Sequence, residues 1–347
     1  MSIIQDFDLN TLDRLLRTFG ERPQALNLDT QLPVLMRALQ ADHLDLLPLP
    51  GQGNTLRRWQ SLARIAGCDL ALAKLFEGHT DALAILAECA AAHRAADGIW
   101  GVWAAEPPDA RARIIAREGD QVRLTGRKAW CSGALQIDRA LITAWDEDDQ
   151  PQLVAIELAH PSQGLRIDGW QAVGMASTSS VEIEFNDSPG IAIGRPGQYL
   201  SRPGFWHGGA GIAACWYGAA EALADYLREH CRNPRPDPHA DAHLGAVDAA
   251  LYGARAALRE CAAWIDRQPG AEASFEVRRT RAQVEHAVEQ VICHVGRALG
   301  ATPFCRSSHF ARLSADLPVY LRQSHAERDL AALGQQLAHV PAGAWQL

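Results

Sequence analysis

Apolar side chains from about residue 9 to residue 95 recur three and four residues apart, with polar and charged side chains between them. Leucine and alanine dominate these segments. A helix that carries one apolar stripe can pack that stripe against neighbouring helices. The pattern therefore predicts an N-terminal helical subdomain over residues 1–97.

From about residue 100 to residue 195 the apolar pattern becomes short and strand-like. Segments such as QVRLTGRKAWCSGA, QPQLVAIELAH and SSVEIEFND are separated by glycine, proline, aspartate and asparagine. Short apolar runs bounded by turn-forming residues are typical of β-strands. They predict a middle β subdomain over residues 98–198.

Helical spacing returns after about residue 203 in alanine-rich segments. We expect four helices in a C-terminal subdomain over residues 199–347, the last of them in SADLPVYLRQSHAERDLAALGQQLA, residues 314–338. The order of helices, strands and helices predicts an α+β fold class.

Composition and charge narrow the class of partner. The chain has 347 residues, 48% of them hydrophobic, and a formal net charge of −8. Without a dense lysine and arginine run, we expect no nucleic acid and no membrane partner, and a small-molecule substrate instead. No apolar run is long enough to span a bilayer and no signal-peptide pattern is found, so we expect a cytoplasmic protein. The cysteines form no CxxC pair, and no metal site is predicted.

Five local motifs occur in a fixed order. WAAEP occupies residues 103–107, GRKAWCSGA residues 126–134 and AVGMASTSSVEIEFND residues 172–187. Arg232 follows, shortly before a predicted helix, and GRALGA occupies residues 296–301. In this order the motifs resemble those of the acyl-CoA dehydrogenase family of flavoproteins, and the resemblance covers nearly the whole chain.

The resemblance implies an acyl-CoA dehydrogenase-like fold with an N-terminal helical subdomain, a middle β-barrel-like subdomain and a C-terminal four-helix bundle. It implies FAD as the cofactor and a homodimer or homotetramer, because Arg232 matches an arginine that reaches the FAD of a neighbouring subunit. The residues that it implies for cofactor binding are Ala105, Trp130, Ser132, Arg232, Arg297 and Gly300.

Trp130 and Ser132 fit flavin binding on physical grounds. A flavin ring needs a flat apolar neighbour and a hydrogen-bond donor at N5, the atom that accepts hydride. Residues two apart on an extended segment point to the same side, so the two side chains are expected to serve one ligand. The alternative for the isolated tripeptide is a tryptophan packed under a helix and a serine that ends a strand.

Two departures from the family concern the cofactor. The family has a Gly-Gly-Ser-Asp type turn after the Glu-Pro dipeptide, whereas here Glu106 and Pro107 run into PDARARII. That turn helps to cradle the pyrophosphate in the family, so one contact with FAD is missing. Arg297 stands where many members have glutamine, and its charge can compensate near the phosphates.

A third departure concerns the catalytic base. Dehydrogenation of an acyl thioester needs a carboxylate that takes the α-proton while N5 takes the β-hydride. The family position of that glutamate falls on Ser324, and the alternative position falls near Gly208, with only His207 close by. Glu327, three residues on, and His325 are the candidate catalytic residues. The alternative for this cluster is a solvated helix surface.

Three functions follow from these observations. The first is FAD-dependent α,β-dehydrogenation of an acyl thioester such as an acyl-CoA, with Glu327 or His325 as the base and an unidentified electron acceptor. The second is a flavin-dependent monooxygenase of the same fold, which the missing carboxylate favours. The third is a non-catalytic homologue. A hydrolase with Ser324, His325 and Asp329 as its catalytic triad is disfavoured. The side chains of residues adjacent in the sequence point away from each other, and no GxSxG motif is present.

Overall fold

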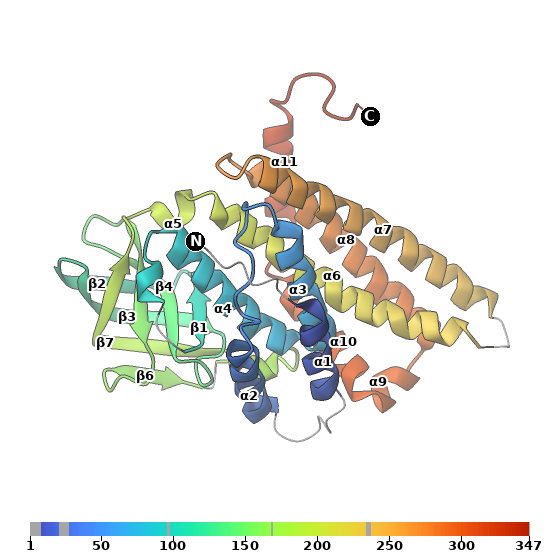
Figure 1. The fold of residues 1–347 in the computed structure, drawn as a ribbon, viewed down its shortest axis with the longest axis horizontal. Helices are drawn as coiled ribbons and strands as arrows, with labels where there is room; N and C mark the ends of the chain where they lie inside the picture. Colours follow the sequence, from blue (N-terminus) through green and yellow to red (C-terminus); the bar gives the residue numbers. More distant parts are fainter. Residues whose placement is uncertain (1–7, 21–27, 96–97, 168, 234–236, 347) are drawn as a thin grey trace. The chain divides into compact units, whose positions relative to one another are not determined.

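The computed structural model describes residues 8–20, 28–95, 98–167, 169–233 and 237–346. The predicted order of helices, strands and helices is confirmed (Figure 1). The helices are α1 (Leu9–Gly20), α2 (Leu28–Ala41), α3 (Thr55–Cys68), α4 (Leu70–Glu88), α5 (Gln198–Ser201), α6 (Gly204–Cys231), α7 (Pro238–Arg267), α8 (Ser274–Leu299), α9 (Thr302–Arg306), α10 (Ser308–Leu321) and α11 (Glu327–Leu337), with short 3₁₀ turns η1 (Ala92–Arg94) and η2 (Ala176–Thr178). The strands are β1 (Trp100–Trp103), β2 (Ala112–Glu118), β3 (Gln121–Cys131), β4 (Arg139–Trp145), β5 (Pro151–Glu157), β6 (Gln163–Arg166) and β7 (Val181–Ile193).

The chain forms two compact units. The first comprises Met1–Leu47 and Ala71–Phe205, and the second comprises Pro48–Leu70 and Trp206–Leu347. The first unit therefore contains the sheet, and the second contains α3 and the C-terminal helices. The three-part division at residues 97/98 and 198/199 stays a prediction. No helix among the described residues is long and apolar enough to cross a bilayer.

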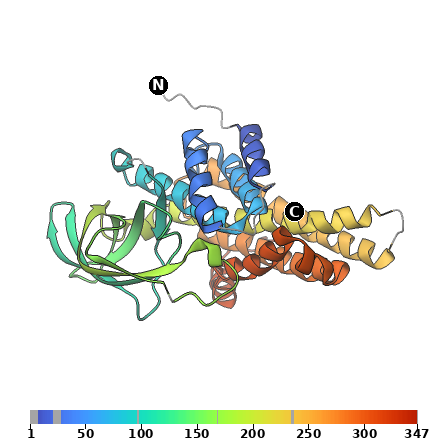
Figure 2. The same cartoon turned by 90° about the horizontal axis from the view of Figure 1, so that it is seen from below.

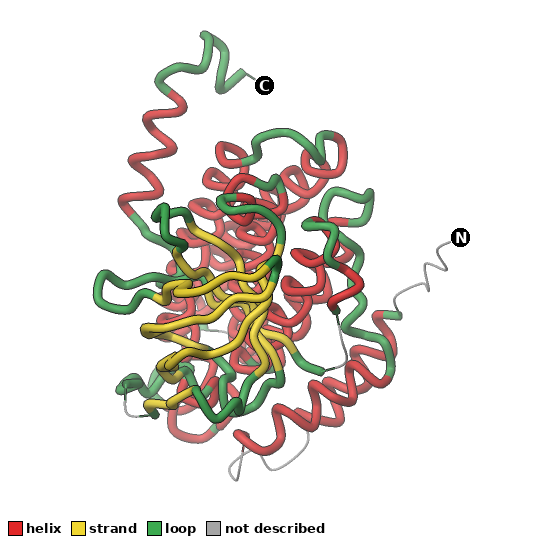
Figure 3. The backbone as a smooth tube through the Cα atoms, turned by 90° about the vertical axis from the view of Figure 1, so that its left-hand side faces the viewer, coloured by secondary structure: helices red, strands yellow, loops and turns green. Residues whose placement is uncertain are grey.

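The sheet of the first unit closes on itself. Its strands pair in the order β1-β4-β2-β3-β7-β5, β5 also pairs with β4, and β6 adds to β7. The pairs β2–β3, β3–β7, β7–β5 and β5–β4 are antiparallel, and a single parallel pair between Arg113 and Trp145 joins β2 to β4. Figure 3 shows these strands in yellow. A closed ring leaves few free strand edges, and it matches the β-barrel-like subdomain that the sequence predicts.

Helix α4 supplies part of the core of the first unit. Ile85 and Leu86 of α4 pack against Trp100 of β1, Leu141 of β4 and Ile193 of β7, all at 3% exposure or less. Burial of large aliphatic and aromatic side chains contributes about 1.5–3 kcal/mol each. This packing fixes where β1 begins, and with it the WAAEP motif.

The second unit is a helical bundle built on α6, α7 and α8. Figures 1 and 2 show α7 and α8 running side by side. The buried residues of α8 include Val277, Val284, Val288, Val291 and Val295, which lie on one face at helical spacing. The valine and alanine stripes of the sequence therefore form the bundle core.

A close approach between α3 and α6 needs a residue without a side chain. A Cβ atom at Gly218 of α6 would lie 2.0 Å from the carbonyl oxygen of Ala63 in α3. No other residue type leaves the two backbones this close. This contact holds α3 in the bundle unit.

The last predicted helix, residues 314–338, is wrong as a single element. Helix α10 ends at Leu321, α11 begins at Glu327, and Ala326 between them has φ of +45°. The Ser324 hydroxyl accepts the Ala326 N–H, and the Asp329 carboxylate accepts the His325 N–H. These side chains satisfy backbone groups that a continuous helix would pair internally, so the chain turns here.

The bundle unit also contains a histidine with a shifted pKa. Nε2–H of His309 donates to the Gly67 carbonyl oxygen at 3.0 Å, and Nδ1 lies 3.0 Å from the Tyr226 hydroxyl. Burial lowers the pKa of His309 from its ordinary value of 6.5, Arg312 acts in the same direction, and the Gly67 carbonyl opposes them. The folded protein therefore favours the neutral imidazole.

We expect this histidine to make the bundle less stable in weak acid. Because the pKa of His309 is lower in the folded state than in the unfolded state, its contribution is complete above about pH 6.5 and is lost as the pH falls through the folded pKa. Urea unfolding at pH 7.5 and pH 5 should show a smaller loss of stability on acidification in His309→Gln than in the parent. Equal losses in the two proteins would contradict the prediction.

Candidate functional site

Two sequence motifs of the first unit are joined by two side-chain contacts. Nε1–H of Trp103 donates to the Ser132 carbonyl oxygen at 3.0 Å, and Nζ of Lys128 donates to Oε1 of Glu106 at 3.1 Å. Trp103 and Glu106 lie on either side of Ala105 in the sequence. Lys128 and Ser132 lie on either side of Trp130, so the two contacts flank both residues. The structure thus brings the WAAEP loop and the end of β3 together.

Ala105 and Trp130 both present groups to the outside of this junction. Ala105 is exposed just after β1, and within the described chain its backbone N–H and C=O have no hydrogen-bond partner. Trp130 keeps 57% of its surface exposed and has φ of +56°. The left-handed backbone conformation is strained for a large side chain, and exposure of its apolar surface to water is also unfavourable. These two costs mark Trp130 as a candidate binding residue.

The extended geometry expected for Trp130 and Ser132 is wrong. The pairing of β3 with β7 becomes irregular between Lys128 and Cys131, and the Ser132 N–H donates to the Trp130 carbonyl oxygen at 3.0 Å. Gly133 follows with φ of +76°. The chain leaves the sheet here, so strand alternation does not place the two side chains on one side.

A buried ion pair anchors the WAAEP loop. Oε1 of Glu106 accepts from Lys128 and from the Thr143 hydroxyl at 2.6 Å, and Oε2 accepts from Nε1–H of Trp145 at 2.8 Å. Lys128 has no exposed surface, and its Nζ also lies 2.6 Å from the Thr143 hydroxyl. Burial lowers the pKa of Lys128 against the opposing charge of Glu106. Burial alone would raise the pKa of Glu106, but the Thr143 hydroxyl and the Lys128 charge outweigh it, and the pKa is lowered.

Sequence reasoning did not find this ion pair. The sequence feature that points to the pair is a glutamate in WAAEP and a lysine in GRKAWCSGA, each next to small or aromatic residues. Buried charges of this kind occur where they are paired.

In the segment that contains Lys128, burial raises the pKa of the Cys131 thiol to about 12, so that this thiol stays protonated.

Three hydroxyl groups form a chain that begins at Ser132, two residues after Trp130 in the sequence. Oγ of Ser132 lies 3.1 Å from Oγ of Ser180, which lies 2.8 Å from Oγ1 of Thr178. Thr178 donates to the Met175 carbonyl oxygen at 2.7 Å. The Gly133 N–H donates to the Thr178 carbonyl oxygen at 2.6 Å. The motif at residues 172–187 therefore joins the same site, through hydroxyl chemistry suited to a polar ligand edge.

The remaining predicted cofactor residues lie in the second unit. Arg232 follows α6, is exposed and pairs with Glu229 at 2.7 Å. Arg297 is exposed in the last turn of α8, and Gly300 ends that helix with φ of +61°. Their roles at a flavin stay predictions.

The candidate base residues do not form one helical face. Ser324 is buried and donates to Oε2 of Glu285, whose Oε1 accepts from Arg322 at 3.1 Å. His325 and Glu327 are both exposed, and Nδ1 of His325 lies 3.6 Å from Asp329. Their catalytic role stays a prediction of the dehydrogenase hypothesis. Glu285, which sequence reasoning missed, accepts hydrogen bonds on both carboxylate oxygens.

An arginine contacts the backbone beside both positions at which the resemblance implies a carboxylate base. Arg281 of α8 donates through Nη1 to the Gly209 carbonyl oxygen and through Nη2 to the Gln323 carbonyl oxygen, the latter at 3.1 Å. These carbonyls adjoin Gly208 and Ser324, and the guanidinium also lies 4.6 Å from the centre of the Trp216 ring. The bundle thus places a cation beside both positions.

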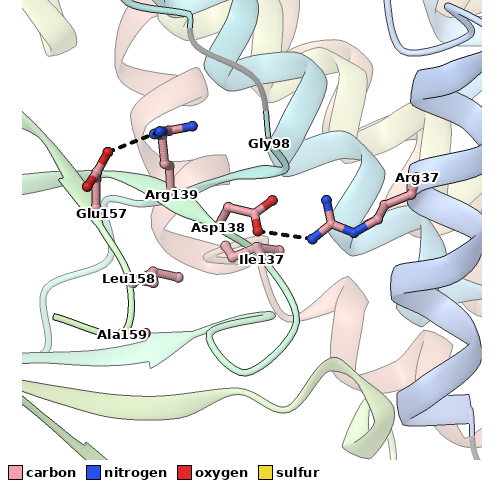
Figure 4. Close-up of a pocket in the computed structure, with 8 residues that line it drawn as sticks. All are labelled: Arg37, Gly98, Ile137, Asp138, Arg139, Glu157, Leu158 and Ala159. Atoms are coloured by element: carbon pink, nitrogen blue, oxygen red, sulfur yellow. Dashed lines mark hydrogen bonds and ion pairs between the residues drawn. The ribbon is translucent and has the colours of Figure 1, made fainter.

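A separate open pocket of about 510 Å³ lies in the first unit (Figure 4). Arg37 of α2 pairs with Asp138, and Arg139 of β4 pairs with Glu157, each at 3.0 Å. Each guanidinium of the pocket is thus matched by a carboxylate. It contains none of the residues predicted from the motifs, and we assign no ligand to it.

Comparison with known proteins identifies the fold. No family model matches the chain, and no curated protein matches it. Among solved structures, it is similar to methanesulfinate monooxygenase MsuC from Pseudomonas fluorescens, with a TM-score of 0.79, 19% identity, and coverage of 96% of this chain and 97% of that one. It is similar to a nitrososynthase from Micromonospora carbonacea var. africana, with a TM-score of 0.80, 16% identity and coverage of 95% and 96%.

A third similar structure is TdsC from Paenibacillus sp. A11-2 in complex with FMN and indole. Its TM-score is 0.75 at 16% identity, with coverage of 95% of this chain and 96% of that one. At these identities the likenesses show the fold. The chain has the acyl-CoA dehydrogenase-like fold that the sequence predicts.

Proposed function

We propose that this protein is a flavin-dependent monooxygenase that binds FMN. The observation that carries the proposal is the hydrogen bonding of Arg281 to the carbonyls beside Gly208 and Ser324, which puts a cation beside both positions where the resemblance implies a carboxylate base. The comparisons support the monooxygenase alternative better than dehydrogenation of an acyl thioester, because MsuC is a monooxygenase by name.

The residues of the first unit fit a flavin ring. Trp130 offers a flat exposed surface, Ala105 offers a backbone N–H and C=O, and Ser132 offers a hydroxyl at the same junction. This set matches a planar, mainly apolar ring with polar atoms along one edge. The mononucleotide is favoured over the expected FAD, because the turn that cradles the pyrophosphate is missing and TdsC carries FMN.

Reduced flavin supplies the two electrons with which one atom of O₂ enters the substrate and the other leaves as water. In this proposal Trp130 would stack against the ring, and the Glu106–Lys128 pair would hold the WAAEP loop in position beside it. We further propose a small-molecule substrate and, from the exposed Arg232 and Arg297, a homodimer or homotetramer. The substrate and the electron donor are not assigned.

Anaerobic and aerobic flavin spectroscopy tests the proposal. We expect that acyl-CoAs leave the FMN-loaded protein oxidised without O₂, and that the chemically reduced protein consumes O₂ and oxygenates a compound from a panel of sulfinates, aromatic heterocycles and amines. Glu327→Gln and His325→Ala should change oxygenation less than about twofold, whereas loss of a working base costs about 10²–10⁴-fold.

Opposite results would separate the alternatives. Bleaching of the flavin by an acyl-CoA, abolished by Glu327→Gln or His325→Ala, would establish dehydrogenation and refute the oxygenase proposal. A purified protein that binds neither FMN nor FAD would support the non-catalytic homologue.

A further inference from the structure

Two histidines of the bundle unit face each other between α7 and α8. Nδ1 of His243 lies 2.8 Å from Nδ1 of His294, and the ring centres are 5.1 Å apart. A contact this short between two nitrogens needs one hydrogen, so one ring donates through Nδ1–H and the other accepts. The two Nδ1 atoms are therefore directed at one shared position between the helices.

This shared position suits a metal ion. Neutral imidazole nitrogen is a common ligand of Zn²⁺ and Cu²⁺, whereas Mg²⁺ and Ca²⁺ prefer oxygen. Two nitrogens at about 2.0–2.1 Å from a tetrahedral zinc ion lie about 3.3 Å apart, so the rings need to separate by only about 0.5 Å. Both side chains are half-buried, so an ion can reach them from solvent.

A third histidine lies one turn before His243 on α7. His239 and His243 are four residues apart in the segment HADAH, a spacing at which two helical histidines can bind one zinc ion. No three metal-binding side chains converge in the described part of the chain, so His239 has to turn toward the pair. Its side chain is exposed, and a change between staggered rotamers there costs little.

We propose that His239, His243 and His294 form a binding site for a divalent transition-metal ion, which joins α7 to α8. The ion takes the place of the shared hydrogen, both rings of the pair then keep their proton on Nε2, and water fills the fourth position. Sequence reasoning missed this site because His243 and His294 are 51 positions apart. The site contains none of the residues assigned to the flavin, so it is independent of the proposed function.

Titration of the purified chain with Zn²⁺ at pH 7.5, after removal of metal by a chelator, tests the site. We expect one zinc ion per chain and a melting temperature that rises with zinc concentration, because the ion binds the folded bundle. His243→Gln and His294→Gln should each raise the dissociation constant about tenfold or more, since each removes a ligand, and His239→Gln should raise it less.

Two controls separate this site from unspecific binding to surface histidines. His286→Gln, at an exposed histidine of α8 outside the site, should change neither the dissociation constant nor the zinc-dependent rise in melting temperature. Mg²⁺ should not raise the melting temperature of the parent, because it prefers oxygen ligands.

Two results would overturn the proposal. One is a parent chain that shows no saturable zinc binding at millimolar concentration, and the other is an unchanged affinity in both His243→Gln and His294→Gln. If these variants do not fold, the electron paramagnetic resonance spectrum of the parent with one equivalent of Cu²⁺ decides the question. Splitting from coordinated nitrogen would support the site, and a spectrum of oxygen ligands alone would refute it.

Discussion

Glu106→Gln is expected to lower the free energy of unfolding by about 3 kcal/mol or more, the usual cost of leaving a buried charge without its partner. Lys128 has no exposed surface, and its ammonium group is paired with this carboxylate at 3.1 Å. The variant keeps the size of the side chain, so lost packing contributes little. Urea unfolding at pH 7 measures the change.

Two further variants serve as controls for this result. Glu106→Gln combined with Lys128→Met removes both charges and should recover most of the lost stability, since a neutral replacement of a buried pair is often well tolerated. Glu184→Gln breaks a surface pair with Arg166 and should cost less than about 1 kcal/mol. A double variant as unstable as the single one would show that the ion pair is not the cause.

Trp130→Ala is expected to weaken FMN binding by about 2 kcal/mol, roughly thirtyfold in the dissociation constant, because the ring loses its aromatic neighbour. The tryptophan is 57% exposed, so its removal leaves no large cavity in the protein itself. Quenching of flavin fluorescence measures the constant. Trp345→Ala, at a tryptophan that is 84% exposed in the second unit, should leave it unchanged.

The backbone conformation of Trp130 allows a test in which stability and FMN affinity change in opposite directions. Trp130 has φ of +56°, a conformation that glycine adopts without strain. Trp130→Gly should therefore raise the stability of the flavin-free protein by up to about 1 kcal/mol while it weakens FMN binding. Unchanged FMN affinity in both Trp130 variants would remove Trp130 from the site.

Periodicity alone predicted the order of helices and strands, because a side-chain spacing of 3.6 or 2 residues is a local property of the chain. The motifs predicted the fold for the same reason, since WAAEP and GRKAWCSGA carry their pattern within a few residues. The prediction of one long final helix was wrong, because contacts that helical spacing does not reveal interrupt it. The side chains of Ser324 and Asp329 bond backbone groups that helical periodicity assumes to be paired.

The sequence by itself determined that Trp130 and Ser132 lie in a β-rich segment, and that no carboxylate occupies the position of Ser324. Only the tertiary structure decided which groups surround them. The contact of Lys128 with Glu106 and the chain from Ser132 to Thr178 join residues 22 and 46 positions apart. Arg281 reaches carbonyls 72 and 42 positions away. Contacts at such separations depend on how strands pair and helices pack, and no local pattern of side chains encodes them.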